Sequence, residues 1–232
     1  MQGKTIVVTG GLGALGSIVA ETAAKRGAAV ALLDHAQAVP QGFAERLGAN
    51  TLLVGGVDLT SLTAAETAMA AANAKFGRID ALLNIAGGFQ WDTFADGKVD
   101  SWDRMYAMNL KTALNACKAA LPYLLESGAG RIVNVGAGSA LHASSGFGPY
   151  AASKSAVHRL TESLADELKL KGVTVNAVLP SIIDTPANRA SMPRADFGKW
   201  VTPQELADVI LFLASDAASA VTGALVPVSG RV

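Results

Sequence analysis

The order of apolar segments is the feature that most limits how this chain can fold. Short runs of β-branched and aliphatic residues alternate with longer Ala-rich segments in which apolar residues recur at helical spacing. This alternation predicts βαβ units, and the continuously apolar runs indicate a parallel α/β sheet with helices on both faces. The predicted strands are Thr5–Thr9, Ala29–Leu33, Thr51–Val54, Ile79–Asn84, Arg131–Val135, Val173–Val178 and Ala224–Val228.

Length and composition indicate how many domains these strands build. The chain has 232 residues, of which 50% are hydrophobic and 16% charged. This composition excludes a disordered chain or a coiled coil and favours a large core with a thin charged surface. Because α/β domains of this length are common, we expect a single domain over residues 1–232 with one seven-stranded sheet.

Two long helices are predicted from apolar spacing. The segment from Trp102 to Glu126 carries one apolar stripe, which is expected to lie on the sheet. A second helix is predicted from Tyr150 to Lys171, with Gly172 as its end signal. Between Ser181 and Trp200 no period is sustained, so this stretch is expected to be a lid or substrate loop. The first stripe consists of Leu110, Ala113, Leu114, Cys117, Leu121 and Leu124.

Charge and cysteine content exclude several classes of function. Lys plus Arg and Asp plus Glu both number 19, and no basic run forms a patch, so nucleic acid is not an expected partner. The single cysteine, Cys117, is expected to be a buried thiol in a reducing, cytoplasmic setting. Neither a secretory leader nor a membrane span is expected. The three histidines lack partners at metal-ligand spacing, so no metal site is predicted.

A glycine-rich segment follows the first predicted strand. Residues 10–16 read Gly-Gly-Leu-Gly-Ala-Leu-Gly and lead into a segment, 17–26, with helical character. Such a turn lets a pyrophosphate approach the amides at a helix N-terminus, where the helix dipole favours anions. The alternative is a glycine-rich turn with no ligand. The order of strand, glycines, helix and a later acidic residue favours a dinucleotide site.

The later acidic residue is Asp34, at the end of the second predicted strand. It lies 18 residues after Gly16, near the separation expected for a carboxylate that binds the adenosine ribose. Because this carboxylate would repel a 2′-phosphate and only His35 beside it could become a cation, NAD(H) is favoured, with NADP(H) as the alternative. Asp58 could contact the adenine, or could cap a helix that begins near Thr60.

Tyr150 and Lys154 are four residues apart, so on a helix they share one face. A free phenol has a pKa of about 10, which a neighbouring ammonium group lowers. The pair could therefore transfer a proton near neutral pH. The alternative is an ordinary amphipathic helix with the lysine in solvent.

Several motifs in order resemble the short-chain dehydrogenase/reductase family over essentially the whole chain. They are Thr9-Gly10 with Gly16, Asn84-Ile85-Ala86-Gly87, Asn109, Tyr150-x-x-x-Lys154 and Asn176-x-x-x-Pro180. The resemblance implies a Rossmann-type, doubly wound domain that transfers hydride to or from a nicotinamide. It also implies that Tyr150 is the general acid/base, that Lys154 holds the nicotinamide ribose and lowers the tyrosine's pKa, and that Asn109 anchors a relay water.

The same resemblance implies a set of residues that line the cofactor. They are Gly10, Gly13, Ala14, Leu15, Gly16, Asp34, His35, Asp58, Leu59, Asn84, Ala86, Gly87, Tyr150, Lys154, Pro180, Ile183 and Thr185.

Three positions depart from the family's motifs. Ala14 replaces the second glycine of the first motif, and Ser181 replaces the glycine after Pro180. The catalytic serine expected 13 residues before Tyr150 is Ala137, which cannot donate a hydrogen bond to a substrate oxygen. Ser139 would face the same way as Ala137 in an extended backbone and could supply the hydroxyl, or it could bond its own backbone.

A local resemblance to the quinonoid dihydropteridine reductases, a branch of the same family, offers a reason for Ala137. It rests on residues 11–17, Ala86-Gly87-Gly88-Phe89, Gly136-Ala137 and residues 184–197. That branch uses NADH and also has alanine in place of the serine. Asn109 and the segment Pro203–Ser215, by contrast, resemble ordinary family members.

The sequence therefore predicts an NAD-preferring oxidoreductase that acts on a small carbonyl, alcohol or similar substrate. An NADH-dependent pteridine reductase is the subsidiary hypothesis, and a non-catalytic NAD(H)-binding regulator is the alternative from another class. Met192, Phe197 and Trp200 could be walls for a flat or apolar substrate, or could pack their loop onto the body. Low charge and apolar helices suggest that some helical surface is buried between subunits, and the family resemblance implies a homodimer or homotetramer.

Overall fold

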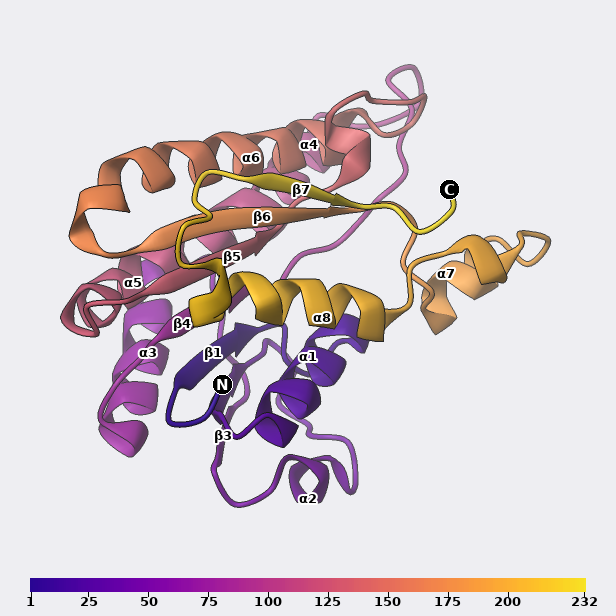
Figure 1. The fold of residues 1–232 in the computed structure, drawn as a ribbon. Helices are drawn as coiled ribbons and strands as arrows, with labels where there is room; N and C mark the ends of the chain where they lie inside the picture. Colours follow the sequence, from indigo (N-terminus) through magenta and orange to yellow (C-terminus); the bar gives the residue numbers. More distant parts are fainter.

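All seven strands of the computed structural model, which describes residues 1–232, lie in one parallel sheet (Figure 1). The spatial order is β3-β2-β1-β4-β5-β6-β7. The chain moves outward from β1 to β3 and then crosses back to β4, so the strand order reverses between β1 and β4. In doubly wound sheets ligands bind at the carboxyl ends of strands at such a reversal. The strands are β1 (Thr5–Thr9), β2 (Ala29–Leu33), β3 (Thr51–Val54), β4 (Ala81–Asn84), β5 (Arg131–Val135), β6 (Thr174–Pro180) and β7 (Leu225–Val228).

The predicted α/β fold with a seven-stranded parallel sheet is confirmed. β1, β2, β3 and β5 have the predicted bounds, whereas β4 begins two residues later than predicted and β6 extends to Pro180. The central strands are buried along their whole length. Continuous burial explains why these strands read as unbroken apolar runs in the sequence.

Helices cover both faces of the sheet. One core cluster joins the sheet to α1, α2 and α8, and the second joins it to α3, α5 and α6. Figure 1 shows α1 and α8 side by side on the first face. The helices are α1 (Ala14–Lys25), α2 (Phe43–Leu47), α3 (Leu62–Phe76), α4 (Asp100–Met105), α5 (Thr112–Glu126), α6 (Gly148–Leu168), α7 (Pro186–Ser191) and α8 (Pro203–Leu213). None of them is both long enough and apolar enough to span a membrane.

The first predicted long helix differs from expectation in its middle. A π-helical segment, Tyr106–Lys111, joins α4 to α5, so the helical path is continuous but locally widened by one residue per turn. Of the predicted stripe, Ala113, Cys117 and Leu124 are buried, but Leu114 is exposed. The π segment shifts the helical phase, which a prediction based on a constant period cannot include.

Three other predicted boundaries require correction. The segment Ser181–Trp200 is not fully irregular, because it contains α7 and a short 3₁₀ turn. The helix expected near Thr60 begins at Leu62 and is capped by Ser61, not by Asp58. α6 begins at Gly148 and ends in a 3₁₀ turn before Gly172, which has the positive φ typical of a helix end.

Candidate active site

The glycine-rich turn lies at the carboxyl end of β1, at the reversal of strand order. Gly13 caps α1 without a side-chain hydrogen bond, and the first turn of α1 contains no acidic residue. The amides of Ala14, Leu15 and Gly16 make no hydrogen bond within the protein. The N-terminus of α1 therefore presents free N–H groups to an anion.

Close packing explains two of the glycines. A Cβ atom on Gly16 would overlap the carbonyl oxygen of Gly10. Gly10 has φ of +64°, and a Cβ atom there would lie 2.9 Å from the Cα of Ala86 in the loop after β4. The loops that follow β1 and β4 are therefore in direct backbone contact, which brings Ala86 and Gly87 to the glycine turn.

Asp34, at the end of β2, fixes the glycine turn. One carboxylate oxygen accepts the Leu12 amide hydrogen at 2.9 Å, and the other accepts that of Ala36 at 2.9 Å. Each oxygen has a further lone pair, so the carboxylate can still accept hydrogen bonds from a ribose. The neighbouring His35 is exposed.

The structure separates the roles of Asp58, Leu59 and Asn84. The exposed Asp58 accepts hydrogen bonds from the hydroxyl and amide of Thr60, which lower the pKa of its carboxyl. Leu59 is buried, and its carbonyl accepts a bond from Asn115. Asn84 is also buried, and its amide donates to Asn134 at 2.8 Å and to the Cys117 sulfur at 3.2 Å. The Asn84 side-chain nitrogen therefore joins β4 to β5 and α5 inside the core.

Asn109 connects the loop after β4 to α6. Its side-chain oxygen accepts the Gly88 amide hydrogen at 2.9 Å, and its side-chain nitrogen donates to the Ser153 hydroxyl at 2.9 Å. Ser153 in turn donates to the carbonyl oxygen of Tyr150 at 2.7 Å. Asn109 lies in the π-helical segment and is buried, so the widened turn places this side chain between the two elements. The linking role of Ser153 was missed from the sequence, although its position three residues after Tyr150 puts it near the tyrosine's face of the helix.

Tyr150 and Lys154 lie in the first turns of α6, as their spacing predicts. Lys154 is buried, and its ammonium group donates to the carbonyl oxygen of Val135 at 2.7 Å. A Cβ atom on Gly87 would lie 3.3 Å from Nζ of Lys154 and 2.6 Å from Oδ1 of Asn109. The structure therefore gathers Gly87, Asn109 and Lys154 at one place beside Tyr150.

Burial shifts the pKa values of this pair in opposite directions. It lowers the pKa of Lys154 to about 8 and raises that of Tyr150 to about 12, because both charged forms lose solvation. Burial therefore sets the direction of the Tyr150 shift, while the ammonium group of Lys154 is bound to Val135. The lowering of the Tyr150 pKa by Lys154 remains an expectation for the site with cofactor bound.

Ala137, at the position of the missing serine, is buried two residues after the end of β5. Its amide donates to Nε2 of His158, a buried imidazole whose pKa is lowered chiefly by burial. Ser139 lies in a 3₁₀ turn, Gly138–Ala140, so the extended-backbone argument for its direction is wrong. The Ser139 hydroxyl makes no hydrogen bond with its own backbone or with any other group of the protein, and it is partly exposed.

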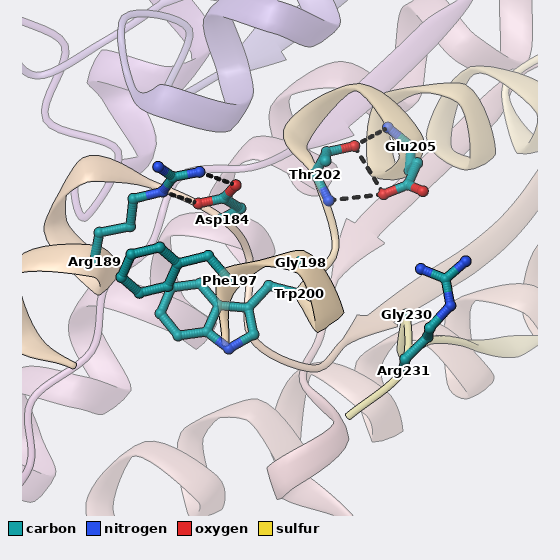
Figure 2. A pocket seen from close by; sticks show the side chains of 9 residues that line it. All are labelled: Asp184, Arg189, Phe197, Gly198, Trp200, Thr202, Glu205, Gly230 and Arg231. Carbon is teal, nitrogen blue, oxygen red and sulfur yellow. Dashed lines mark hydrogen bonds and ion pairs between the residues drawn. The ribbon is translucent and has the colours of Figure 1, made fainter. Parts of the chain in front are cut away.

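The segment after β6 forms the next wall of this region. Ile183 pairs with Val201, and Thr185 caps α7 by accepting the Asn188 amide hydrogen. Asp184 and Arg189 form two charge-assisted hydrogen bonds of 2.6 and 2.7 Å. They line a cavity of about 380 Å³, shown in Figure 2. Its lining residues are Asp184, Arg189, Phe197, Gly198, Trp200, Thr202, Glu205, Gly230 and Arg231.

This cavity contains none of the predicted catalytic residues, so it does not constitute the candidate site. The Arg189 guanidinium lies 4.7 Å from the Phe197 ring centre, and the rings of Phe197 and Trp200 are 4.8 Å apart. Trp200 is buried. Of the two roles considered for these aromatic residues, packing of the loop onto the body describes Trp200. No group of three or more His, Cys, Asp or Glu residues is arranged to hold a metal ion.

Comparisons with known proteins agree with this geometry. The short chain dehydrogenase family model matches residues 4–196. The 2-(S)-hydroxypropyl-CoM dehydrogenase 3 of Xanthobacter autotrophicus is 32% identical over 250 residues, which cover 99% of this chain and 96% of the relative. The solved structure of a short-chain type dehydrogenase/reductase from Mycobacterium ulcerans has a TM-score of 0.93 at 28% identity. The match covers 100% of this chain and 90% of the Mycobacterium ulcerans chain. Carveol dehydrogenase from Mycobacterium avium, solved in complex with NAD, has a TM-score of 0.89 at 25% identity. The match covers 99% of this chain and 97% of the carveol dehydrogenase chain.

Fold, motifs and relatives together define an oxidoreductase enzyme. The chain belongs to the short-chain dehydrogenase/reductase family, whose members bind NAD(P)(H) and act on small-molecule substrates.

Proposed function

We propose that this chain is an NAD(H)-preferring dehydrogenase/reductase of a small carbonyl or alcohol substrate, with Tyr150 as general acid/base. The observation that carries the proposal is the convergence of Tyr150, Lys154 and Asn109 on the loop that contains Gly87. Two relatives are named dehydrogenases of hydroxyl compounds, and one solved neighbour is in complex with NAD, which supports the same chemistry.

The residues present fit a dinucleotide. The free amides of Ala14, Leu15 and Gly16 suit a pyrophosphate, and the Asp34 carboxylate suits a ribose diol and disfavours a 2′-phosphate. A bound nicotinamide supplies or accepts the hydride in this family. The remaining residues proposed to contact the cofactor are Gly10, Gly13, His35, Asp58, Leu59, Ala86, Gly87, Tyr150, Lys154, Pro180, Ile183 and Thr185, with Asn84 acting from inside the core.

The proton moves at Oη of Tyr150. During reduction this hydroxyl donates a proton to the substrate oxygen, and during oxidation the phenolate removes it. Because the pKa of Lys154 is about 8, its side chain remains mostly charged at pH 7 and can stabilise the phenolate. Asn109 acts as a positioning residue, because its side chain is committed to Gly88 and Ser153. Ser139 is proposed to supply the hydroxyl that Ala137 lacks.

The experiment that tests this proposal compares Tyr150→Phe with Tyr123→Phe, a tyrosine on α5 remote from the site. We expect Tyr150→Phe to abolish NADH oxidation with carbonyl substrates while NADH still raises the melting temperature. Tyr123→Phe is expected to retain activity. Full turnover by Tyr150→Phe would contradict the assignment of the acid/base, and absence of any NADH-induced shift in the wild type would contradict the cofactor.

A second candidate function is the NADH-dependent reduction of a quinonoid dihydropterin. The buried Ala137 favours it, because hydride transfer to a ring nitrogen system needs no hydroxyl to polarise a ketone. Parallel assays with the pterin and with small ketones, in wild type and Ser139→Ala, separate the two candidates. Pterin turnover that is unchanged in Ser139→Ala supports the second candidate. Ketone turnover that falls in Ser139→Ala, without loss of cofactor binding, supports the first.

A further inference from the structure

Three aromatic side chains on the two loops beside Tyr150 are referred to below as the aromatic wall: Phe89 and Phe147, whose rings contact that of Tyr150, and Trp91, whose indole packs on Gly146 next to Phe147. The Phe89 ring meets that of Tyr150 edge to face, with centres 5.0 Å apart and an interplanar angle of 85°. The Phe89 and Phe147 rings are 5.1 Å apart, and Phe147 and Tyr150 are 6.4 Å apart. These separations are typical of interacting aromatic rings.

Two loops that are distant in sequence build the aromatic wall and are fixed to each other. The Asp92 amide donates to the carbonyl oxygen of Gly146 at 2.9 Å. Gly146 has φ of +76°, and a Cβ atom there would collide with the Trp91 indole, so the indole lies directly on the glycine backbone. The Asp92 carboxylate also accepts a hydrogen bond from Ser101 at the start of α4. Figure 1 shows the two loops projecting together beyond the carboxyl ends of the strands.

The aromatic wall remains open to solvent although its backbone is fixed. Phe89 is 53% exposed and Trp91 is 58% exposed. Exposed aromatic surface that adjoins a reactive group is typical of a binding surface, because burying it gains hydrophobic free energy. Ala137, in the loop after β5, offers no hydroxyl to orient a substrate oxygen. Contacts to the rest of the substrate can therefore contribute to its orientation beside the hydroxyl proposed for Ser139.

We propose that the aromatic wall binds a planar aromatic or conjugated ring of the substrate and thereby places the adjoining carbon–oxygen group at Tyr150. The inference rests on the proposed function, because it takes Tyr150 as the reacting group. A second copy of the chain would be the other occupant of such a surface. Ring contacts between Phe89 and Tyr150 make the substrate the better match, since a subunit docked on Phe89 would cover the approach to the acid/base.

The test measures the affinities of two alcohols of similar size, 1-phenylethanol and 1-cyclohexylethanol, by calorimetry with and without saturating NAD⁺. We expect the phenyl compound to bind the wild type several-fold more tightly. Phe89→Leu is expected to reduce this preference by roughly three- to tenfold, the range that an aromatic pair contributes. Phe94→Leu is the matched control, because Phe94 is on the same loop, is 92% exposed and has no ring partner.

Equal affinities for the two alcohols in the wild type, or an equal loss in both phenylalanine variants, would overturn the inference. A change of sedimentation coefficient in Phe89→Leu but not in Phe94→Leu would assign the wall to a subunit contact and would also overturn it. The same samples are assayed for NAD⁺ reduction. A phenyl preference that depends on Phe89, without any turnover of either alcohol, would support ring binding while contradicting the proposed alcohol oxidation.

Discussion

At the scale of single residues, Lys154 combines a functional position with a cost in stability. It is 5% exposed, and its only hydrogen bond joins Nζ to the Val135 carbonyl oxygen. The lowering of its pKa from 10.5 to about 8 corresponds to about 3 kcal/mol at roughly 1.4 kcal/mol for each tenfold change in the protonation equilibrium. One hydrogen bond returns only about 1 kcal/mol. The free-energy cost of burying the charged ammonium group is therefore larger than the gain from its hydrogen bond.

We expect Lys154→Met to raise the free energy of unfolding by about 2 kcal/mol at pH 7 while abolishing turnover. Because the folded-state pKa is lowered, the wild type gains stability as the pH rises from about 8 towards 10.5, where the lysine is neutral in both states. The difference in the free energy of unfolding between Lys154→Met and the wild type should therefore decrease over this pH range. Urea unfolding at pH 7 and pH 10 measures the free energy of unfolding of the variant and the wild type. Lys171→Met, at an exposed lysine, is the control. A variant less stable than wild type at pH 7 would contradict the argument.

At the scale of elements, the end of β2 organises the start of α1. Asp34 accepts the Leu12 amide hydrogen across the sheet, so the strand end fixes the turn whose free amides face the proposed pyrophosphate. We expect Asp34→Ala to weaken NADH binding roughly tenfold, the loss of a hydrogen bond to a charged group. NADPH binding should weaken less, because the repulsion of the 2′-phosphate is removed. Fluorescence titration of both cofactors tests this, with Asp166→Ala as a surface control. An unchanged ratio of the two affinities would refute Asp34 as the selector.

How far each element could be predicted from the sequence depends on whether its signal is local. The buried strands show as continuous apolar runs, so most of their bounds were correct. The π-helical segment was not predicted, because a prediction from a constant helical period does not include a local change of phase. The contacts of Asn109 with Gly88 and Ser153 were also missed, because these residues come from three parts of the chain. The raised pKa of Tyr150 was not predicted for a similar reason, since it depends on burial of the phenol, which spacing along one helix does not show.

At the scale of the whole molecule, apolar surface is unevenly distributed. The path from α4 to α5 exposes several large apolar side chains along its length. They are Trp102, Tyr106, Met108, Leu114 and Leu125. Isolated apolar residues on a surface need no explanation, but a series along one helical path indicates an association surface. The predicted homodimer or homotetramer would use such a face, because a two-fold axis lets the same helices pack against their own copies.

Leu114 tests this prediction because it is 41% exposed in the middle of the path. We expect the wild type to sediment as a dimer or tetramer and Leu114→Arg to sediment as a smaller species, since an arginine placed in an apolar interface loses its hydration without gaining a partner. Leu170→Arg is the matched control, because Leu170 is 93% exposed in the 3₁₀ turn after α6 and is remote from this path. Circular dichroism should show that both variants keep their helices. A monomeric wild type, or equal dissociation by both variants, would place the association surface elsewhere.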